Sequence, residues 1–340
     1  MARIALDAMG GDHAPHAPVA AALLAAVELG DAHHLQLVGR SAEIRAELDS
    51  QLASAPASGA VAAAALATAA ARVEIVDAPD VIAMTDKPSV AIRGKPESSM
   101  AVGIRLQAEG KSDAFVSAGN TGAQMAASTF LLKLHEGLTR PAIGTVFPTA
   151  RQPVVVLDSG ANVDCSAKEL VQFARLGHVY ARDILGRENP AVGLLSIGEE
   201  AEKGNAAVKE AHQLLLTSGL NFIGNVEGRD IPAGACDRGA IDVVVCDGFT
   251  GNVLLKFYEA VAPMLFGMLL KGGVTKEQLG AVVHSLDYAK YGGAPLLGVR
   301  GVSIICHGKS TPEAIKNGVL AARRAVDARM SKHIGEQLAS

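Results

Sequence analysis

The segment from Ile241 to Lys256 constrains the fold most strongly, because it indicates a buried strand that turns directly into a helix. It opens with Ile-Asp-Val-Val-Val-Cys, a β-branched apolar run typical of a strand that is covered on both faces in a parallel sheet. The helix follows the loop Asp247-Gly-Phe-Thr-Gly-Asn252. Such a loop lies at the carboxyl edge of the sheet, where open α/β sheets bind ligands. The segment therefore predicts an α/β protein with a site at its strand ends.

Three other predicted strand ends carry the same small and amide residues, at Ala114–Gly122, Val154–Asn162 and Val192–Gly198. Glycine lets the backbone approach a ligand, and unpaired N–H groups at the start of a helix attract an anion. For any single loop the better explanation is that a β-to-α turn needs Gly and Asn for its own geometry. Four such loops in one chain favour a shared rim that binds something negatively charged.

The overall charge excludes a general binder of polyanions. The chain of 340 residues has a formal net charge of −4 and a pI near 6.2, so any anion site is local and nucleic acid is not an expected partner. The four cysteines are far apart in the sequence, and no charged-then-apolar leader precedes the first strand. This pattern predicts reduced thiols and a cytoplasmic location. No uncharged run reaches the roughly 18 to 20 apolar residues of a spanning helix, so we expect no membrane crossing.

Strand and helix patterns alternate from the first residues onward, with strands expected at Arg3–Asp7, Leu35–Val38 and Val73–Val76. The hydrophobic share of 49% is enough for a large aliphatic core, in one large domain or two smaller ones. Residues 53–71 consist mostly of Ala with Val, Leu, Thr and Ser. Alanine forms helices readily but buries little area, so we expect a partly helical surface insertion without a function of its own.

The loop Ile197–Asn205 holds the most informative cation, Lys203. It comes just before a predicted helix, where the positive end of the helix dipole disfavours a lysine unless an anion or a carboxylate is also present. Lys203 therefore indicates an anion site. The alternative is a solvated loop lysine that pairs with Glu199 or Glu200.

Residues 253–291 begin with an unusually apolar helix. Its run Ala260–Leu270 contains no charged residue and is framed by Lys256, Glu259 and Lys271. Prolonged exposure of such a surface to water is costly, so something must cover it. We expect a contact in a homodimer, and the other interpretation is a surface that rests on a bilayer or on an acyl chain.

Several common catalytic motifs are absent from the sequence. Gly308-Lys309-Ser310 resembles the end of a phosphate-binding Walker loop, but Ser303 stands where that motif requires glycine. No G-x-G-x-x-G follows the first strand, and neither G-x-S-x-G nor H-E-x-x-H occurs. We therefore expect no dinucleotide cofactor, no metal site and no serine nucleophile.

Seven blocks of the sequence together resemble the bacterial phosphate acyltransferase of phospholipid synthesis, over nearly the whole chain and in the same order. They are Ile4-Ala-Leu-Asp-Ala-Met-Gly-Gly-Asp-His-Ala-Pro15, Ser117-Ala-Gly-Asn-Thr-Gly-Ala123, Gly160-Ala-Asn-Val-Asp164, Lys203-Gly-Asn205, Phe222-Ile-Gly-Asn-Val-Glu227, Asp247-Gly-Phe-Thr-Gly-Asn-Val253 and Tyr291-Gly-Gly-Ala294. The resemblance implies one phosphate-acyltransferase-like domain over residues 1–340. It also implies an α/β/α sandwich with a mostly parallel sheet, similar to the isocitrate/isopropylmalate dehydrogenase and phosphotransacetylase group.

The resemblance implies transfer of a fatty acyl group from acyl carrier protein to inorganic phosphate. The acyl phosphate product then serves in the acylation of glycerol 3-phosphate, so the membrane glycerol-3-phosphate acyltransferase is an expected partner. It further implies a cytoplasmic homodimer with peripheral membrane contact. Phosphate is already a nucleophile at neutral pH, so an enzyme of this kind has to hold an anion against a thioester and stabilise the oxyanion that forms.

The matching loops supply the candidate site residues. We predict catalytic roles for Lys203 and Asn252. The predicted substrate-binding residues are Asp12, His13, Ser117, Asn120, Thr121, Asn162, Asn205, Asn225 and Asp247.

Two alternatives of different kinds stay open at this point. A phosphotransacetylase-like enzyme that uses acyl coenzyme A would share the anion rim. A non-catalytic scaffold for acyl carrier or membrane would need only the apolar helix. The scaffold is disfavoured because it has no use for an anion-binding rim of Asn loops around Lys203.

Overall fold

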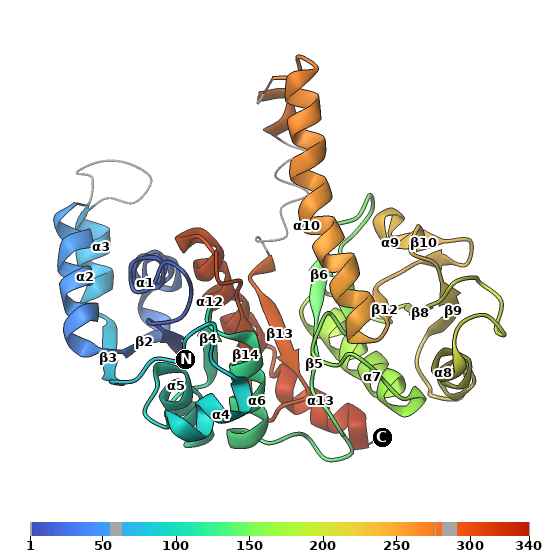
Figure 1. Cartoon of the computed structure of the whole chain (residues 1–340), viewed down its shortest axis with the longest axis horizontal. Coiled ribbons are helices and arrows are strands. Elements are labelled where there is room, and N and C mark those ends of the chain that lie inside the picture. The colour runs from blue at the N-terminus through green and yellow to red at the C-terminus, as the bar shows by residue number, and fades with distance from the viewer. Residues whose placement is uncertain (1, 55–62, 276, 281–290, 340) are drawn as a thin grey trace. The chain divides into compact units, whose positions relative to one another are not determined.

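The computed structural model describes residues 2–54, 63–275, 277–280 and 291–339 (Figure 1). Parts of two predicted segments, the Ala-rich insertion at 53–71 and the apolar segment at 253–291, therefore lie outside the described residues. The chain forms two compact units. The first comprises Met1–His135 with Ala289–Lys332, and the second comprises Glu136–Tyr288 with His333–Ser340. The expectation of one phosphate-acyltransferase-like domain over residues 1–340 stays a prediction.

The first unit is built on a mostly parallel sheet. Its strands are β1 (Arg3–Asp7), β2 (His34–Gly39), β3 (Val73–Asp77), β4 (Ala114–Ser117), β13 (Ala294–Leu297) and β14 (Ser303–Ile305). They lie in the order β3-β2-β1-β4-β14-β13, and only the β13–β14 pair is antiparallel. The register pairs Ile4 with Leu35 on one side and with Ala114 on the other. β1, β4 and β14 therefore end at the same edge, and their side chains form much of the core.

Helices cover this first sheet. They are α1 (His16–Leu29), α2 (Ser41–Ala53), α3 (Ala63–Ala70), α4 (Pro88–Gly94), α5 (Ser99–Ala108), α6 (Thr121–Leu131) and α12 (Pro312–Asp327), with a short 3-10 turn at Gly30–Ala32. α3 belongs to the Ala-rich insertion and packs against α1 and α2. Ala69 is its one buried residue, so the described part of the insertion is helical and superficial, as the sequence predicts.

The second unit has a five-stranded sheet. Its strands are β6 (Thr145–Phe147), β7 (Val154–Leu157), β8 (Val192–Leu195), β9 (Phe222–Val226) and β12 (Val243–Val245). The order is β6-β7-β12-β8-β9, with β6 antiparallel to β7 and the other pairs parallel. All residues of β7 and β12 are buried. This confirms that the Ile241–Cys246 run contains a strand covered on both faces.

The remaining elements of the second unit lie outside this five-stranded sheet. They are β5 (Ala142–Ile143), the antiparallel pair β10 (Ala235–Cys236) and β11 (Gly239–Ala240), α7 (Ala167–Asp183), α8 (Ala206–Leu216), α9 (Asp230–Ala233) and α10 (Gly248–Lys271). A last helix, α13 (Met330–Ala339), ends the chain. α7 begins with a capping box in which Ser166 and Glu169 satisfy each other's backbone N–H groups.

The helix α10 begins at Gly248, five residues earlier than the apolar pattern alone predicts. The Asp247 side chain caps it by accepting a hydrogen bond from the Thr250 N–H at 2.8 Å. Gly248 and Gly251 form its first turn, and both pack against the loop after β7. A Cβ at Gly248 would lie 2.5 Å from the Asn162 carbonyl oxygen, and one at Gly251 would overlap the Asp158 carbonyl oxygen. Glycine is therefore required there by close approach, despite its low helix propensity.

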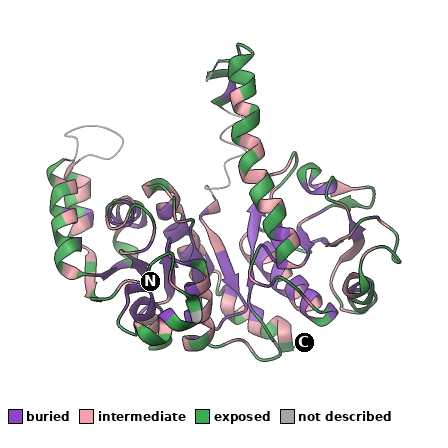
Figure 2. Ribbon diagram, viewed as in Figure 1, coloured by how far each residue is buried: buried purple, intermediate pink, exposed green. Residues whose placement is uncertain are grey.

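Beyond its first turn, α10 projects from the second unit and is mostly exposed (Figures 1 and 2). Phe257, Met264 and Met268 are each more than half exposed. Among the described residues, α10 is the one helix long and apolar enough to cross a membrane on length and composition alone. The charged Lys256 and Glu259, which form an ion pair at 2.8 Å, interrupt its apolar surface. Because of these two charged residues, the sequence contains no uncharged run long enough to span a membrane.

We predict that Gly251→Ala lowers the free energy of unfolding by about 1 to 3 kcal/mol, because the added methyl group forces α10 away from the Asp158 loop. The matched control is Gly267→Ala on the same helix, where an added Cβ meets open space. That control should be neutral or stabilising by up to about 1 kcal/mol, since alanine is the better helix former. Urea unfolding followed by circular dichroism measures both. Equal changes in the two variants would contradict the packing argument.

Candidate active site

Three of the four glycine-rich strand ends predicted from the sequence belong to the second unit. The loops after β7, β12 and β8 begin at Asp158, Cys246 and Ser196, and β12 lies between the other two strands. Because these strands are parallel, their loops meet at one edge of the sheet. The fourth predicted loop follows β4 and belongs to the first unit. Each unit thus has its own rim of strand-end loops.

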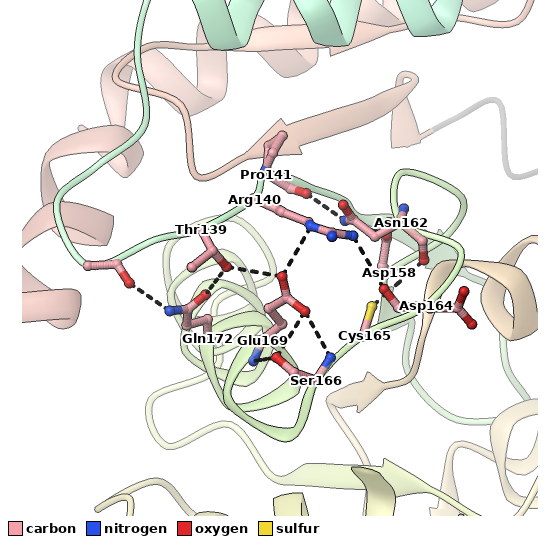
Figure 3. A network of polar contacts seen from close by, with 11 residues as sticks. Thr139, Arg140, Pro141, Asp158, Asn162, Asp164, Cys165, Ser166, Glu169 and Gln172 are labelled. Carbon is pink, nitrogen blue, oxygen red and sulfur yellow. Dashed lines mark hydrogen bonds and ion pairs between the residues drawn. The ribbon is translucent and has the colours of Figure 1, made fainter.

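The carboxylate of Asp158 organises the loop after β7 (Figure 3). One carboxylate oxygen accepts backbone N–H groups of Ile143, Gly160 and Ala161 at 3.0 to 3.2 Å. The other accepts the Asn162 N–H at 2.6 Å and the Asn162 side-chain amide at 2.9 Å. Burial raises the pKa of Asp158, and these hydrogen bonds act in the opposite direction. These hydrogen bonds fix the loop, and they leave the Asp158 carboxylate with no free oxygen for a ligand.

The network in Figure 3 continues from this loop to α7. Arg140 forms an ion pair with Glu169 at 3.2 Å and donates to the Asp164 carbonyl oxygen at 3.4 Å. Glu169 also accepts hydrogen bonds from Thr139 and from the N–H and hydroxyl of Ser166. The loop 158–166 is therefore held at both ends, by Asp158 and by the start of α7.

A polar cavity of about 330 Å³ lies beside this loop. We call it the rim cavity. Its polar side chains are Asp164, Asn205, Asp247 and Thr250, and Val163, Leu170, Val208 and Phe249 are among its apolar ones. The volume is within the usual range for small-molecule sites.

Two helix N-termini open onto the rim cavity. Asn205 caps α8 by accepting the Val208 N–H at 2.9 Å. Asp247 caps α10 and also accepts the Thr250 hydroxyl at 2.9 Å. The positive ends of two helix dipoles thus point toward one space. The structure brings the predicted residues Asn205 and Asp247 together in this cavity.

Lys203 stands two residues before the Asn205 cap and is exposed. No ion pair of Lys203 occurs within the described part of the chain. Glu199 pairs instead with Arg229 at 3.4 Å and with Arg238 at 3.3 Å. The lysine–glutamate pairing considered as an alternative is therefore not present. Within the described residues Lys203 is therefore an exposed cation without an ion pair, close in the chain to the Asn205 cap of α8.

Asn252 lies on the first turn of α10 and faces the loop after β7. A Cβ at Gly160 would lie 3.5 Å from the Asn252 side-chain oxygen, and Asn252 is exposed. The two residues predicted to be catalytic thus lie on different elements, Lys203 before α8 and Asn252 near the start of α10. Both side chains are accessible to a ligand.

Asn162 and Asn225 have internal partners instead. The Asn162 amide donates to the Pro141 carbonyl oxygen at 2.8 Å as well as to Asp158. The Asn225 amide donates to the Glu200 carbonyl oxygen at 2.7 Å, and its oxygen lies 2.9 Å from Nδ1 of His212. These two asparagines position the rim loops, and the side chain of Asn225 is fully buried. Direct binding of substrate by them stays a prediction.

The five candidate residues in the first unit gather at the edge formed by β1, β4 and β14. Ser117 donates to Asp7 at 2.7 Å and accepts the Gly119 N–H at 2.9 Å, so its hydroxyl is engaged inside the core. Asn120 caps α6, and its amide donates to the carbonyl oxygens of Met84 and Asp86 at 3.1 Å. The side chains of Asp12, His13 and Thr121 are exposed at this edge.

Cys165 and Thr250 line the rim cavity, but the sequence analysis did not select either as a site residue. Burial, together with the charges of Asp158, Glu169 and Asp247, raises the pKa of the Cys165 thiol to about 12. Because the thiolate is the nucleophilic form, Cys165 is a poor nucleophile at neutral pH. Asp158 was also missed, although an acidic residue directly after a buried strand was a usable signal. Within the described residues, no cluster of His, Cys, Asp and Glu could hold a metal ion.

The fold is that of the phosphotransacetylases. The chain superposes on a phosphotransacetylase from Staphylococcus aureus with a TM-score of 0.62 and 14% identity, covering 96% of this chain and 94% of the other. A phosphotransacetylase from Streptococcus pyogenes gives 0.61 and 16%, with the same coverage. 4-Hydroxythreonine-4-phosphate dehydrogenase from Klebsiella pneumoniae, at a TM-score of 0.53 and 14% identity over 95% of this chain and 98% of the other, has a related fold. The fold is therefore the α/β fold that these phosphotransacetylases and this dehydrogenase share, as expected from the sequence.

Sequence relatives narrow this class. Residues 2–333 match the family described as "Fatty acid synthesis protein". The phosphate acyltransferase of Desulforamulus reducens is 46% identical over 99% of this chain and 98% of its own length. That of Heliobacterium modesticaldum is 47% identical over 99% and 97%. The chain belongs to the phosphate acyltransferase family and is an acyltransferase.

Proposed function

We propose that this enzyme transfers a fatty acyl group from acyl carrier protein to inorganic phosphate. The observation that carries the proposal is the rim cavity, onto which the N-termini of α8 and α10 open. Lys203, which has no ion pair in the described part of the chain, stands two residues before the α8 cap. Backbone N–H groups, helix dipoles and one cation are the donors that an anionic nucleophile requires. The family name, which describes acyl transfer to phosphate, supports the same assignment.

Charge decides where the phosphate binds within the cavity. Asp164 and Asp247 line it and repel an anion. Two unit charges 4 Å apart interact by about 4 kcal/mol at the effective dielectric of a protein surface. Both oxygens of Asp247 already accept hydrogen bonds from Thr250, which offsets part of its charge. We therefore assign phosphate to the side of Asn205 and Lys203, away from Asp164.

The reaction needs no enzyme nucleophile. An oxygen of hydrogen phosphate attacks the thioester carbonyl carbon, a C–O bond forms, and the C–S bond breaks. The departing sulfur of the carrier takes the phosphate proton and leaves as a thiol, and the acyl phosphate remains. Lys203 offsets the charge of phosphate and of the oxyanion, and the Asn252 amide donates to that oxyanion. Holding the two reactants in contact supplies the rest of the acceleration.

We predict that the purified protein consumes hexadecanoyl-type acyl carrier protein only when phosphate is present. The product should be an acyl phosphate that hydroxylamine traps, and a chelator should not change the rate. Cys165→Ala should retain the activity, because its thiol is protonated at neutral pH. An acyl group trapped on a cysteine, or loss of activity with chelator, would show that the mechanism is wrong.

We predict that Lys203→Ala lowers turnover by roughly two to three orders of magnitude, the usual loss for one electrostatic contact to a developing oxyanion. Lys209→Ala is the matched control, since Lys209 is also exposed but lies within α8, past the helix start. Steady-state rates at saturating phosphate compare the two variants. Near-normal turnover of Lys203→Ala would show that Lys203 is a solvated loop residue without a catalytic role.

The acyl donor separates this proposal from its nearest alternative. A phosphotransacetylase-like enzyme would accept acyl coenzyme A equally well, so rates with both donors and the same acyl chain decide between them. A scaffold without catalysis would bind the carrier and consume neither donor. We favour acyl carrier protein because the chain belongs to a family described by fatty acid synthesis, in which acyl groups are attached to that carrier.

The proposed product indicates which enzyme acts next and which contacts this enzyme makes in the cell. An acyl phosphate formed in the cytoplasm would be consumed by a membrane acyltransferase that acylates glycerol 3-phosphate in phospholipid synthesis. The exposed apolar side chains of α10 suit a homodimer contact and a peripheral membrane contact. We favour the dimer contact, because only Lys256 and Lys271 flank the apolar run and each adds about 1 kcal/mol of attraction to anionic lipid.

We predict a homodimer that binds vesicles peripherally, with Leu265, Phe266 and Leu269 at or near the contact. Leu265→Glu and Leu269→Glu test this by vesicle co-sedimentation together with sedimentation velocity. Loss of vesicle binding with an intact dimer supports the membrane role. Dissociation or aggregation supports the dimer contact. Unchanged behaviour in both measurements would refute both roles.

A further inference from the structure

We infer that His212 and Asn225 are positioning residues that hold Lys203 where phosphate binds. The inference rests on the proposed function, in which Lys203 offsets the charge of phosphate and of the oxyanion. The two residues are 7% and 0% exposed, and neither lines the rim cavity. They therefore act through the loop that carries Lys203, without touching a substrate.

The backbone carbonyl oxygen of Glu200 is the point at which this loop is held. It accepts the Lys203 N–H at 3.0 Å, which closes a tight turn. It also accepts the side-chain amide of Asn225 at 2.7 Å. Asn225 belongs to β9 and pairs there with Leu194 of β8. The turn that presents Lys203 is thus attached to the sheet by one buried side chain.

The chemistry of donors and acceptors determines how both buried side chains are oriented. A carbonyl oxygen can only accept, so the NH₂ group of Asn225 faces Glu200 and its oxygen faces His212. That oxygen can also only accept, so Nδ1 of His212, 2.9 Å away, carries the proton and donates it. His212 therefore keeps Asn225 from turning its oxygen toward the Glu200 carbonyl, where two acceptors would meet.

His212 is itself held in place by the element that begins at the rim. It lies on α8, about two turns after the Asn205 cap. Its ring packs edge to face on Phe222 of β9, with ring centroids 5.1 Å apart. The contacts thus run from the helix start through His212 and the sheet and return to Lys203, so the lysine is fixed from both sides.

Gly198 guides the side chain of Lys203. A Cβ at Gly198 would lie 2.9 Å from Cγ and 3.4 Å from Cδ of Lys203, and 2.9 Å from a carboxylate oxygen of Glu200. The lysine stem therefore crosses directly over the glycine. Any side chain at this position displaces the stem, although it leaves the contact between His212 and Asn225 intact.

The test is a double-mutant cycle of His212→Leu and Lys203→Ala. Leucine is a good helix former but has no donor for Asn225. Because Lys203 is then misplaced, kcat at saturating phosphate should fall by about tenfold to hundredfold, while the KM of the acyl donor stays unchanged. In the Lys203→Ala background the same substitution should have little further effect, since a positioning residue acts only through the group that it positions.

His212→Asn is the conservative variant that tests the hydrogen bond itself. Its amide nitrogen takes the place of Nδ1 and can donate to Asn225, so it should restore most of the kcat lost in His212→Leu. Equal losses in these two variants would overturn the inference.

Gly198→Ala reaches Lys203 from the other side and keeps the inference testable if His212→Leu fails to fold. It should lower kcat in the same way, again without effect in the Lys203→Ala background. The matched control is Gly228→Ala, where an added Cβ meets open space. The control should keep the kcat of the unmodified protein.

NMR of the histidine ring nitrogens gives a measurement that is independent of activity. At about pH 8, where histidine side chains are ordinarily neutral, the signal that disappears in His212→Asn should show a proton on Nδ1. A proton on Nε2 alone would overturn the inference. If Lys203→Ala keeps full turnover, the proposed role of Lys203 fails and the inference with it. If Lys203→Ala loses turnover but His212→Leu acts equally in both backgrounds, only the inference fails.

Discussion

The contact between the first turn of α10 and the Asp158 loop underlies the rest of the second unit. Gly248 and Gly251 let the helix backbone touch that loop directly, and the Asp158 carboxylate holds the loop by five hydrogen bonds from surrounding N–H groups. Without this contact between α10 and the Asp158 loop, Asp247 and Thr250 would not line the rim cavity beside Asn205. The rim cavity therefore depends on one helix start.

Much of this architecture follows from the sequence, because buried parallel strands and their loops leave strong local patterns. β1, β2, β3, β7 and β12 lie where apolar runs predict them. Local pattern fails where distant contacts decide. Gly248 looks like a loop residue until its contact with Asn162 is known, and Asn225 looks like a ligand residue until its buried partner His212 is known. The division into two units also depends on contacts between remote segments.

The site combines opposite charges in a way that composition does not reveal. Two carboxylates line the rim cavity, and Lys203, which has no ion pair among the described residues, stands two positions before the Asn205 cap. Burial first, and then the charges of Asp158, Glu169 and Asp247, raise the pKa of Cys165 to about 12, so its thiol is protonated at neutral pH. In the proposed reaction phosphate itself is the nucleophile, and the enzyme contributes position and electrostatic stabilisation.

Because α10 is long and contacts the Asp158 loop at Gly251, a small change in its angle at that residue displaces its far end by a large distance. From that glycine to Lys271 the helix rises about 30 Å, so a rotation of about 10° at the base moves the tip by about 5 Å. A small change in the angle at which α10 leaves the Asp158 loop would therefore be a large displacement at Lys271.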